Sequence, residues 1–585
     1  MRKLATLAAI AAVVGTVGCK SLEVTNPNAP DAARAFSDPA AVAGLVAGAM
    51  HTWYGTRGAY YGAMNLATMA ESYTSSWNNA QMRYYNSIGP VGFFQSDCPQ
   101  RCGWVNSTSD AKRFPIESAW YGYYGLLSSV NDVLSAIRRE DDPVVLTDEA
   151  TTKVHEAGSV MLQGVVFSNI ALNYDKGFFV TEATDISNPS ALPFLPREEM
   201  RDSAISIFDQ AIALFSGAGL ADSPESWTGT ISGVSYTPAQ WIKVIRTMQA
   251  ELLAYFPRNA AENTAVNWAQ VATYASQGIS SNVGAPAFDF NFFQDGTDLF
   301  DTEKRTGVNG LLRTHTKIAN LVTGGYPPAL GPGPVHHAVY PGSPEPQPFS
   351  ADQRVGDGSW GPEDDFNGGA TVAATANAGT DFVWSPQEPF RPARGAYHQS
   401  SMFNVRWSYL SYPGYGVPGE DGQALDPLYP QQMNDLLWAE GLLRSGGNAA
   451  TAAALINKTR VGRGGLPALN GGEGLATLLL ALQYEEEVEE YGVSATPFYN
   501  RRRGTPAGWT LGSPCPSILC LYPGTPRQMP VPAKELAVLG QPVYTFGGPT
   551  EPEAAPPGFV ASRGAFRPLP LQMQHKAARG ASRKQ

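Results

Sequence analysis

The sequence lacks the short motifs that mark common catalytic sites. It contains no HExxH zinc-protease motif, no GxSxG nucleophile elbow and no Walker loop for nucleotide phosphates. Its 7 histidines are scattered, and the adjacent pair His336–His337 lies among prolines and glycines. The acidic run Glu363–Asp365 offers oxygen ligands for calcium but lacks the alternating spacing of an EF-hand. The sequence therefore predicts no catalytic residue, no metal site and no cofactor.

Charged residues are also scarce and make up 16% of the 585 residues. The formal net charge is −11, and no dominant basic stripe runs along the chain. Because nucleic-acid binding depends on basic groups that neutralise phosphates, this balance argues against a nucleic-acid partner. The hydrophobic content of 43% is enough for a large globular protein with a sizeable core.

Long apolar runs are limited to the N-terminus. Leu4–Gly18 is apolar and follows the basic start Met1–Lys3, which is the pattern of a signal peptide. The run ends in Thr16–Cys19, which resembles a bacterial lipobox except that Thr16 stands where leucine is usual. This resemblance implies cleavage before Cys19 and lipidation of that residue, which would anchor the mature protein to a membrane. The alternative is an ordinary secretory signal with an incidental cysteine.

Only 5 cysteines are present. Apart from Cys19 they form two local pairs, Cys98 with Cys102 and Cys515 with Cys520. This arrangement fits two disulfides that close small loops in an oxidising compartment. The alternative is a zinc site made by the four later cysteines, although neither pair has CxxC spacing and each contains a proline.

Helical periodicity is the main positive feature. Asn434–Leu469 reads as two short amphipathic helices, with Gly446 and Gly447 ending the first and Asn448 capping the second. The Glu-rich run Glu485–Glu490 is expected to be a solvated helix face paired with arginine. Other helices are expected near residues 38–54, 116–138, 149–173, 197–215, 238–256, 267–277 and 474–491. The fold class is therefore mainly α.

Residues 285–430 lose this periodicity and are rich in glycine, proline, aspartate and aromatics. Loops held on a rigid scaffold are where binding usually resides. Aromatic faces can stack on sugar rings, while Asn, Gln and Arg bond to hydroxyl groups. The candidate ligand-binding residues, chosen from composition, are Trp77, Asn78, Asn79, Trp104, Trp407 and Tyr409.

Several stretches occur in an order that resembles the SusD/RagB family. They are Ser350–Arg354, Asp435–Glu440, Gly447–Asn448, Leu455–Arg460, Gly465–Pro467 and Arg527–Leu536. The run Phe498–Arg503 also resembles a family motif, although Asn500 replaces the usual acidic residue and Val531 replaces an isoleucine in the last stretch. The resemblance implies a tetratricopeptide-like scaffold of helical hairpins with large loop-rich insertions; residues 238–277 fit one such unit.

The resemblance also implies a domain layout and a role. The layout is a signal peptide (1–18), a lipidated N-terminal tether (19–37), an N-terminal helical region (38–284), a loop-rich ligand-binding insertion (285–430), a C-terminal helical region (431–549) and a mobile tail (550–585). The implied role is that of a non-catalytic lipoprotein of the outer membrane. Such proteins bind an oligosaccharide or peptide nutrient and deliver it to a partner TonB-dependent (SusC-like) channel.

Two alternatives remain open from the sequence. One is a surface-anchored glycoside hydrolase, because the paired carboxylates of such enzymes cannot be recognised without their geometry. The other is a helical-repeat scaffold that binds only protein. Neither has a sequence motif of its own in this chain.

Overall fold

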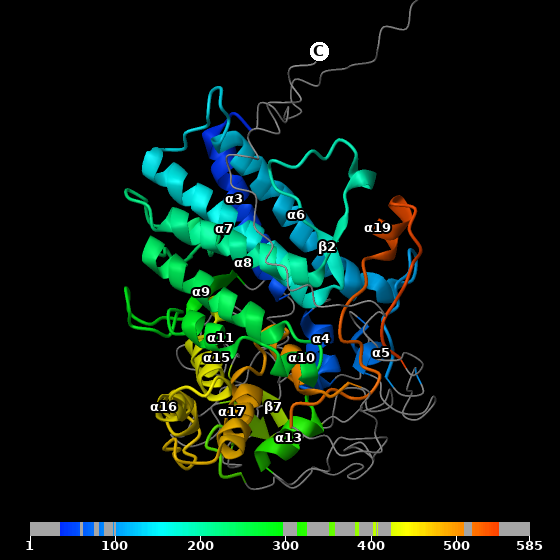
Figure 1. Ribbon diagram of the computed structural model, residues 1–585, viewed down its shortest axis with the longest axis vertical. Coiled ribbons are helices and arrows are strands. Elements are labelled where there is room, and N and C mark those ends of the chain that lie inside the picture. The colour runs from blue at the N-terminus through cyan, green and yellow to red at the C-terminus, as the bar shows by residue number, and fades with distance from the viewer. Residues whose placement is uncertain are drawn as a thin grey trace, which may run out of the picture.

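Antiparallel helices stacked one on the next form most of the described chain (Figure 1). The computed structural model describes residues 36–58, 63–74, 81–86, 98, 101–295, 313–323, 350–356, 381–384, 400, 402–404, 406, 423–507 and 518–548. This architecture confirms the predicted fold class, which is a mainly helical scaffold with loop-rich regions. Within the described residues, no helix is long and apolar enough to cross a membrane.

From α3 at the top to α16 and α17 at the bottom, the main helices are stacked along the long axis of the molecule in their chain order, with α4, α5 and α19 to one side (Figure 1). The longer ones are α3 (Pro39–Arg57), α6 (Phe114–Ile137), α7 (Glu149–Asn173), α8 (Arg197–Phe215), α9 (Pro238–Tyr255), α11 (Trp268–Ala275), α15 (Gln431–Arg444), α16 (Ala449–Arg460), α17 (Leu475–Glu489) and α18 (Thr496–Gly504). The shorter ones are α4 (Ala63–Met69), α5 (Met82–Asn86), α10 (Ala260–Thr264), α13 (Thr316–Thr323) and α19 (Ala533–Val538).

The described strands are short and pair in twos, always antiparallel. The pairs are β1 (Tyr73–Thr74) with β5 (Arg313–Thr314), β2 (Lys176–Phe178) with β3 (Phe194–Pro196), β4 (Phe290–Asp295) with β8 (Gln423–Tyr429), and β6 (Phe382–Trp384) with β7 (Met402–Asn404). The pairs β4–β8 and β6–β7 lie within the predicted insertion 285–430. The pair β1–β5 joins the insertion to the N-terminal helical region.

Local side chains explain where several helices begin. The Asp148 carboxylate accepts a hydrogen bond from the backbone N–H of Thr151 at the start of α7. Thr237 and Gln240 form a reciprocal capping box at the start of α9. Such caps satisfy N–H groups that have no partner within the helix. The predicted helices 149–173 and 197–215 are confirmed over the same residues.

The predicted hairpin at Asn434–Leu469 is also confirmed, as α15 and α16. Asn448 caps α16 by accepting from the N–H of Thr451 at 3.0 Å. Gly446 has a positive φ of 72°, a conformation that favours glycine at a helix C-terminus. Gly441 lies against α11, where an added Cβ would stand 2.6 Å from the backbone nitrogen of Ala272. The small residues Gly441 and Ala272 therefore let this hairpin pack closely on α11.

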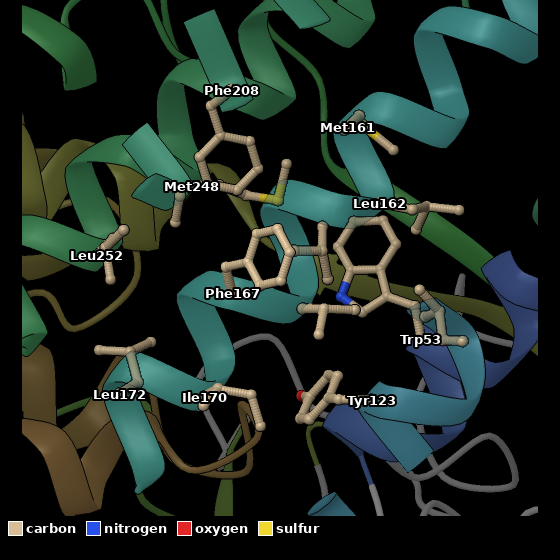
Figure 2. Close-up of a cluster of buried hydrophobic side chains, with 14 of the residues drawn as sticks. Trp53, Tyr123, Met161, Leu162, Phe167, Ile170, Leu172, Phe208, Met248 and Leu252 are labelled. Atoms are coloured by element: carbon tan, nitrogen blue, oxygen red, sulfur yellow. The ribbon is translucent and has the colours of Figure 1, made fainter. Parts of the chain in front are cut away.

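The core lies where α3, α7, α8 and α9 meet, and Figure 2 shows its centre. Phe167 of α7 points between Trp53 of α3 and Met248 of α9, with Phe208 of α8 beside it. Trp53, Phe167 and Phe208 are completely buried. Burying a side chain of this size stabilises the fold by about 1.5–3 kcal/mol relative to exposure.

Close packing of α7 on α8 makes Gly164 sensitive to substitution. An added Cβ would lie 2.6 Å from Cδ1 of Phe208. We expect Gly164→Ala to lower the free energy of unfolding by about 1–3 kcal/mol in urea denaturation, because a packed core resists added volume. The control is Gly44→Ala in α3, where an added Cβ would have no neighbour within 4 Å outside the adjoining helix backbone. There the same change is expected to stabilise by about 0.5–1 kcal/mol, and a stabilised Gly164→Ala variant would contradict the packing argument.

The C-terminal segment returns to the N-terminal helices. The N–H of Trp104 donates to the carbonyl of Phe546 at 2.9 Å, and Tyr174 and Met529 form a parallel β-bridge. The Asn106 amide donates to the carbonyls of Val531 and Tyr544. The predicted motif Arg527–Leu536 thus holds the C-terminal segment against the chain around Asn106 and Tyr174.

Candidate functional site

Several separate segments of the predicted insertion meet beside β1 of the scaffold. β1, which directly follows α4, pairs with β5. The Ser400 hydroxyl donates to the carbonyl of Thr314 at 2.7 Å, which links β5 to the chain just before β7. β7 pairs with β6, and Val355 forms a bridge to Phe382. These short contacts bring together segments that are far apart in the sequence.

A buried group of charges, which we call the Glu489 cluster, lies beside these strands. Its centre is the carboxylate of Glu489, which is 0% exposed at the C-terminal end of α17. Glu489 accepts hydrogen bonds from Arg354 at 2.6 Å, from Arg406 at 2.8 Å and from Arg463 at 2.6 Å. The three arginines come from three separate segments, two of them within the insertion. One carboxylate therefore holds two insertion segments and the loop after α16.

The predicted motif Ser350–Arg354 forms one side of this cluster. Arg354 donates to both carboxylate oxygens of Asp352, at 2.9 and 2.7 Å, and to Glu485 at 2.7 Å. The Tyr484 hydroxyl donates to Asp352 at 2.7 Å. Arg354 is completely buried, so these hydrogen bonds take the place of those that its guanidinium would make to water. The motif is thus explained by an ionic lock between the insertion and α17.

Asp381 completes the Glu489 cluster on its other side. It pairs with Arg463, whose side chain is 25% exposed, and lies 3.7 Å from Arg406. Burial alone would raise the pKa of Glu489, but Arg406, Arg463 and Arg354 together hold that pKa below its ordinary value. The carboxylate is therefore ionised at neutral pH and keeps all three guanidinium groups in place.

The expectation that Glu485–Glu490 is a solvated helix face is wrong. The five glutamates in this run are between 0% and 2% exposed. Helical periodicity shows which residues share a face, but it does not show what covers that face. Here it is covered by arginines from other segments, such as Arg354, which is separated from Glu485 by 131 positions. Arg501 pairs with Glu487 in the same way.

Of the predicted ligand-binding residues, only Trp104 lies within the described chain, and the structure corrects that prediction. Its side chain is 3% exposed. The indole nitrogen donates to the carbonyl of Gln528 at 2.9 Å, and the ring lies 4.8 Å from that of Tyr85. A ring covered in this way packs against the C-terminal segment and has no free face for a ligand.

The other predicted site residues lie outside the described residues. They are Trp77, Asn78, Asn79, Trp407 and Tyr409, together with Cys19 and Cys515. For Trp77 and Trp407, a described residue nearby in the chain is attached to the scaffold. Thr74, in β1, comes three positions before Trp77. Arg406, in the Glu489 cluster, directly precedes Trp407.

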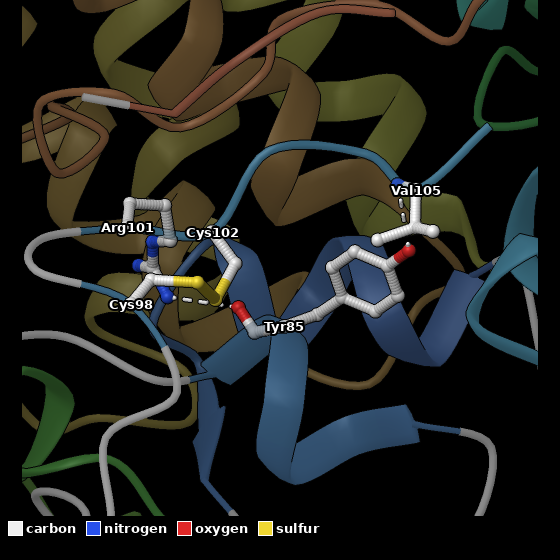
Figure 3. Close-up of a disulfide and its surroundings, with 5 residues drawn as sticks. All are labelled: Tyr85, Cys98, Arg101, Cys102 and Val105. Atoms are coloured by element: carbon white, nitrogen blue, oxygen red, sulfur yellow. Dashed lines mark hydrogen bonds between the residues drawn. A yellow bond between two sulfur atoms is a disulfide. The ribbon is translucent and has the colours of Figure 1, made fainter. Parts of the chain in front are cut away.

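Cys98 and Cys102 form a disulfide (Figure 3). The small loop holds Arg101 against the core, where its guanidinium donates to the carbonyls of Tyr85 and Met69 at 3.0 and 3.1 Å. Cys520 is also disulfide-bonded. The alternative zinc site made by four cysteines is therefore wrong, because zinc binds thiolates and not disulfide sulfurs.

A second buried carboxylate, that of Glu71, is bound by Arg101 of the Cys98–Cys102 loop and by Lys317 of α13. Arg101 pairs with Glu71 at 3.4 Å, and Lys317 donates to Glu71 at 2.9 Å and to the carbonyl of Cys520 at 2.6 Å. Glu71 is 0% exposed and has a φ of 64°, an uncommon conformation for a residue other than glycine. This second ionic contact lies between β1 and α13, at the same end of the scaffold as the Glu489 cluster.

A small cavity lies between α3, α4, α6, α7 and α18 and is lined in part by Arg57, Asn169 and Tyr499. Its volume of ≈ 20 Å³ is enough for one water molecule. A sugar or peptide does not fit there. This cavity is therefore part of the packing between helices and not a nutrient site.

Comparison with solved structures identifies the architecture. The class is a scaffold of helical hairpins that carries a docked, loop-rich insertion. A SusD superfamily protein from Parabacteroides distasonis superposes with a TM-score of 0.52 at 13% identity, covering 85% of this chain and 97% of that one. A SusD-like protein from Bacteroides fragilis gives 0.51 at 14% identity, covering 80% and 86%.

The chain therefore has the SusD-like fold, which confirms the resemblance drawn from the sequence motifs at the level of the fold. No family model matches the chain, and no curated protein matches it. At such low identity the shared architecture is recognised through its helices and not through particular side chains.

Proposed function

We propose that this protein binds a nutrient, an oligosaccharide or a peptide, at the cell surface without modifying it chemically. The observation that carries this proposal is the SusD-like fold, which extends over 85% of the chain. SusD/RagB proteins, which the sequence motifs resemble, bind nutrients for uptake. The buried ionic contacts around Glu489 and Glu71 support the same role, because they give loops a rigid base on which to present a ligand site.

In this proposal the ligand contacts come from the segments that follow the attached residues Thr74 and Arg406. The aromatic rings of Trp77, Trp407 and Tyr409 would stack on sugar rings or apolar side chains. Asn78 and Asn79 would bond to ligand hydroxyl or amide groups. Recognition of this kind needs no proton transfer, metal ion or cofactor.

We further propose that Cys19 carries a lipid that holds the protein on the outer membrane, where it passes the nutrient to a TonB-dependent channel. The N-terminal run and the lipobox-like Thr16–Cys19 support the anchor. Metabolic labelling with a radioactive fatty acid tests it directly. Label is expected in the native protein and absent from the Cys19→Ala variant, and equal labelling of both would refute the anchor.

Nutrient binding is tested with the full-length protein purified in detergent. The probes are an array of structurally defined oligosaccharides and a peptide library from a protease digest. We expect binding to a related set of glycans or peptides, with the bound molecules recovered intact by chromatography. Release of shortened sugars would instead establish the glycoside hydrolase alternative. Absence of binding to every probe, with a channel still copurifying, would favour a scaffold that binds only protein.

A further inference from the structure

A second group of charges is buried where α9, α15, α17 and α18 meet, and we call it the Arg503 cluster. Arg503 of α18 donates to Glu440 of α15 at 2.7 Å and to Glu486 of α17 at 3.2 Å. Glu490, which caps the C-terminus of α17, accepts from the Asn500 amide and the Tyr255 hydroxyl at 2.5 and 3.1 Å. The three glutamates and Arg503 are between 0% and 1% exposed.

The charges of this cluster do not balance. A second cation, Arg444 of α15, donates to Glu440 at 2.6 Å, and its side chain is 21% exposed. Arg444 and Arg503 both lie on the ring of Trp268, at 5.1 and 5.4 Å, which closes this side of the cluster. Tyr255 and Asn500 are neutral at physiological pH. Three carboxylates therefore face two guanidinium groups, and full ionisation would leave one buried negative charge without compensation.

The hydrogen bonds show where this imbalance falls. Glu440 receives bonds from both arginines at Oε1, and its Oε2, which has no hydrogen-bond partner, lies 2.7 Å from a guanidinium nitrogen of Arg503, so its charge is compensated. Glu486 has one long bond from Arg503, and its second oxygen, Oε2, is buried without a hydrogen-bond partner. Glu490 has only neutral donors. Glu486 and Glu490 are four positions apart on one helix, a spacing that brings side chains together.

We propose that Glu486 and Glu490 form a proton-binding site that holds one proton at neutral pH. The proton removes the uncompensated charge of the cluster and supplies an O–H donor where a buried oxygen lacks one. Two buried carboxylates that share a proton in this way titrate as a pair. The electrostatics of the same residues agree with this assignment. Burial raises the pKa of Glu490 to about 8, against the lowering effect of Arg503.

The pKa values of the other two glutamates, Glu486 and Glu440, shift in opposite directions. Burial raises the pKa of Glu486, and the negative charge of Glu440 raises it further. For Glu440, burial acts upwards, but Arg503 and Arg444 outweigh it and lower its pKa. The proton therefore belongs to the Glu486–Glu490 pair and not to Glu440.

This site makes stability depend on pH in a defined direction. The pKa of a pair member is raised in the folded state. The stability that its bound proton contributes is therefore fully present below the ordinary glutamate pKa of about 4.5. It is lost as the pH rises through about 8. Within this window the folded state holds one proton more than the unfolded chain. The folding equilibrium constant is then expected to fall by up to about tenfold for each pH unit.

The test is urea denaturation of the full chain between about pH 5 and pH 9. Glu490→Gln and Glu486→Gln imitate the protonated side chain. We expect at least one of them to flatten the decline of stability over this range and to be more stable than the native protein at the upper end. The matched control is Glu149→Gln, a side chain that is 81% exposed, which should leave the native pH profile unchanged.

Other groups also titrate in this range, such as Asp175, whose pKa burial raises to about 6. Their contribution to the pH profile is the same in each variant and in the native protein, so it cancels in the comparison. A second readout does not depend on variants that fold. Infrared difference spectra of the native protein should show the C=O stretch of a protonated carboxyl at pH 7, which disappears towards pH 9. Absence of this band, or unchanged pH profiles in both folded variants, would overturn the proposal.

Discussion

Replacing Glu489 by alanine is expected to lower the free energy of unfolding by at least about 3–5 kcal/mol, the usual cost of breaking a buried ion pair. The loss of its carboxylate removes the one acceptor that Arg354, Arg406 and Arg463 share, and leaves N–H groups of each guanidinium without that partner. Urea denaturation followed by circular dichroism measures this change. Glu489→Gln retains the shape of the side chain and is expected to lose most of the same stability, because the charge is what the arginines require.

The control for this prediction is an exposed ion pair. Glu149 and Lys153 lie one turn apart on α7, with side chains 81% and 42% exposed. Water and salt screen such pairs, so Glu149→Ala should leave the melting temperature nearly unchanged. Equal melting temperatures for Glu489→Ala and the native protein would show that the cluster adds no stability. In that case the insertion must be held by other contacts.

Removing either predicted stacking ring is expected to weaken ligand binding strongly without unfolding the protein. Trp77→Ala and Trp407→Ala should each raise the dissociation constant by roughly 10- to 100-fold, since an aromatic contact contributes about 1.5–3 kcal/mol through burial. The ligand is the oligosaccharide or peptide found in the array, and calorimetry gives the constant. The melting temperature of the unliganded protein should change little, because these rings are proposed to face the ligand.

Trp104→Ala provides the opposite control. Trp104 is buried and bonded to Gln528, so its removal should cost about 3–5 kcal/mol of stability while the folded fraction keeps its affinity. A comparable loss of stability in Trp77→Ala or Trp407→Ala, with unchanged affinity, would place those rings in the core as well. The three variants together separate a ligand contact from a packing contact.

The sequence predicts those features of the fold that depend on neighbours along the chain. Helix 197–215, the cap at Asn448 and the turn at Gly446 were all deducible, because each depends on residues within one or two helical turns. The disulfide between Cys98 and Cys102 was predictable for the same reason, since it closes a loop of four positions.

The contacts that dock the insertion could not be derived in this way. Nothing near Glu485–Glu490 in the sequence shows that Arg354 and Arg406 will cover it, because both lie more than 80 positions away. The burial of Trp104 depends likewise on Gln528, 424 positions later. A buried Glu-rich helix looks like a solvated one until its partners are placed in space.

The Glu489 cluster has a consequence for how such a protein can diversify. It holds the insertion at three discrete points, Arg354, Asp381 and Arg406. Lengthening a loop between fixed ends costs little, about 0.6 kcal/mol for each doubling. Chain can therefore be inserted, deleted or recombined between these points without redesign of the helices. For the proposed nutrient-binding function, a change of ligand then requires new residues only between the three anchors.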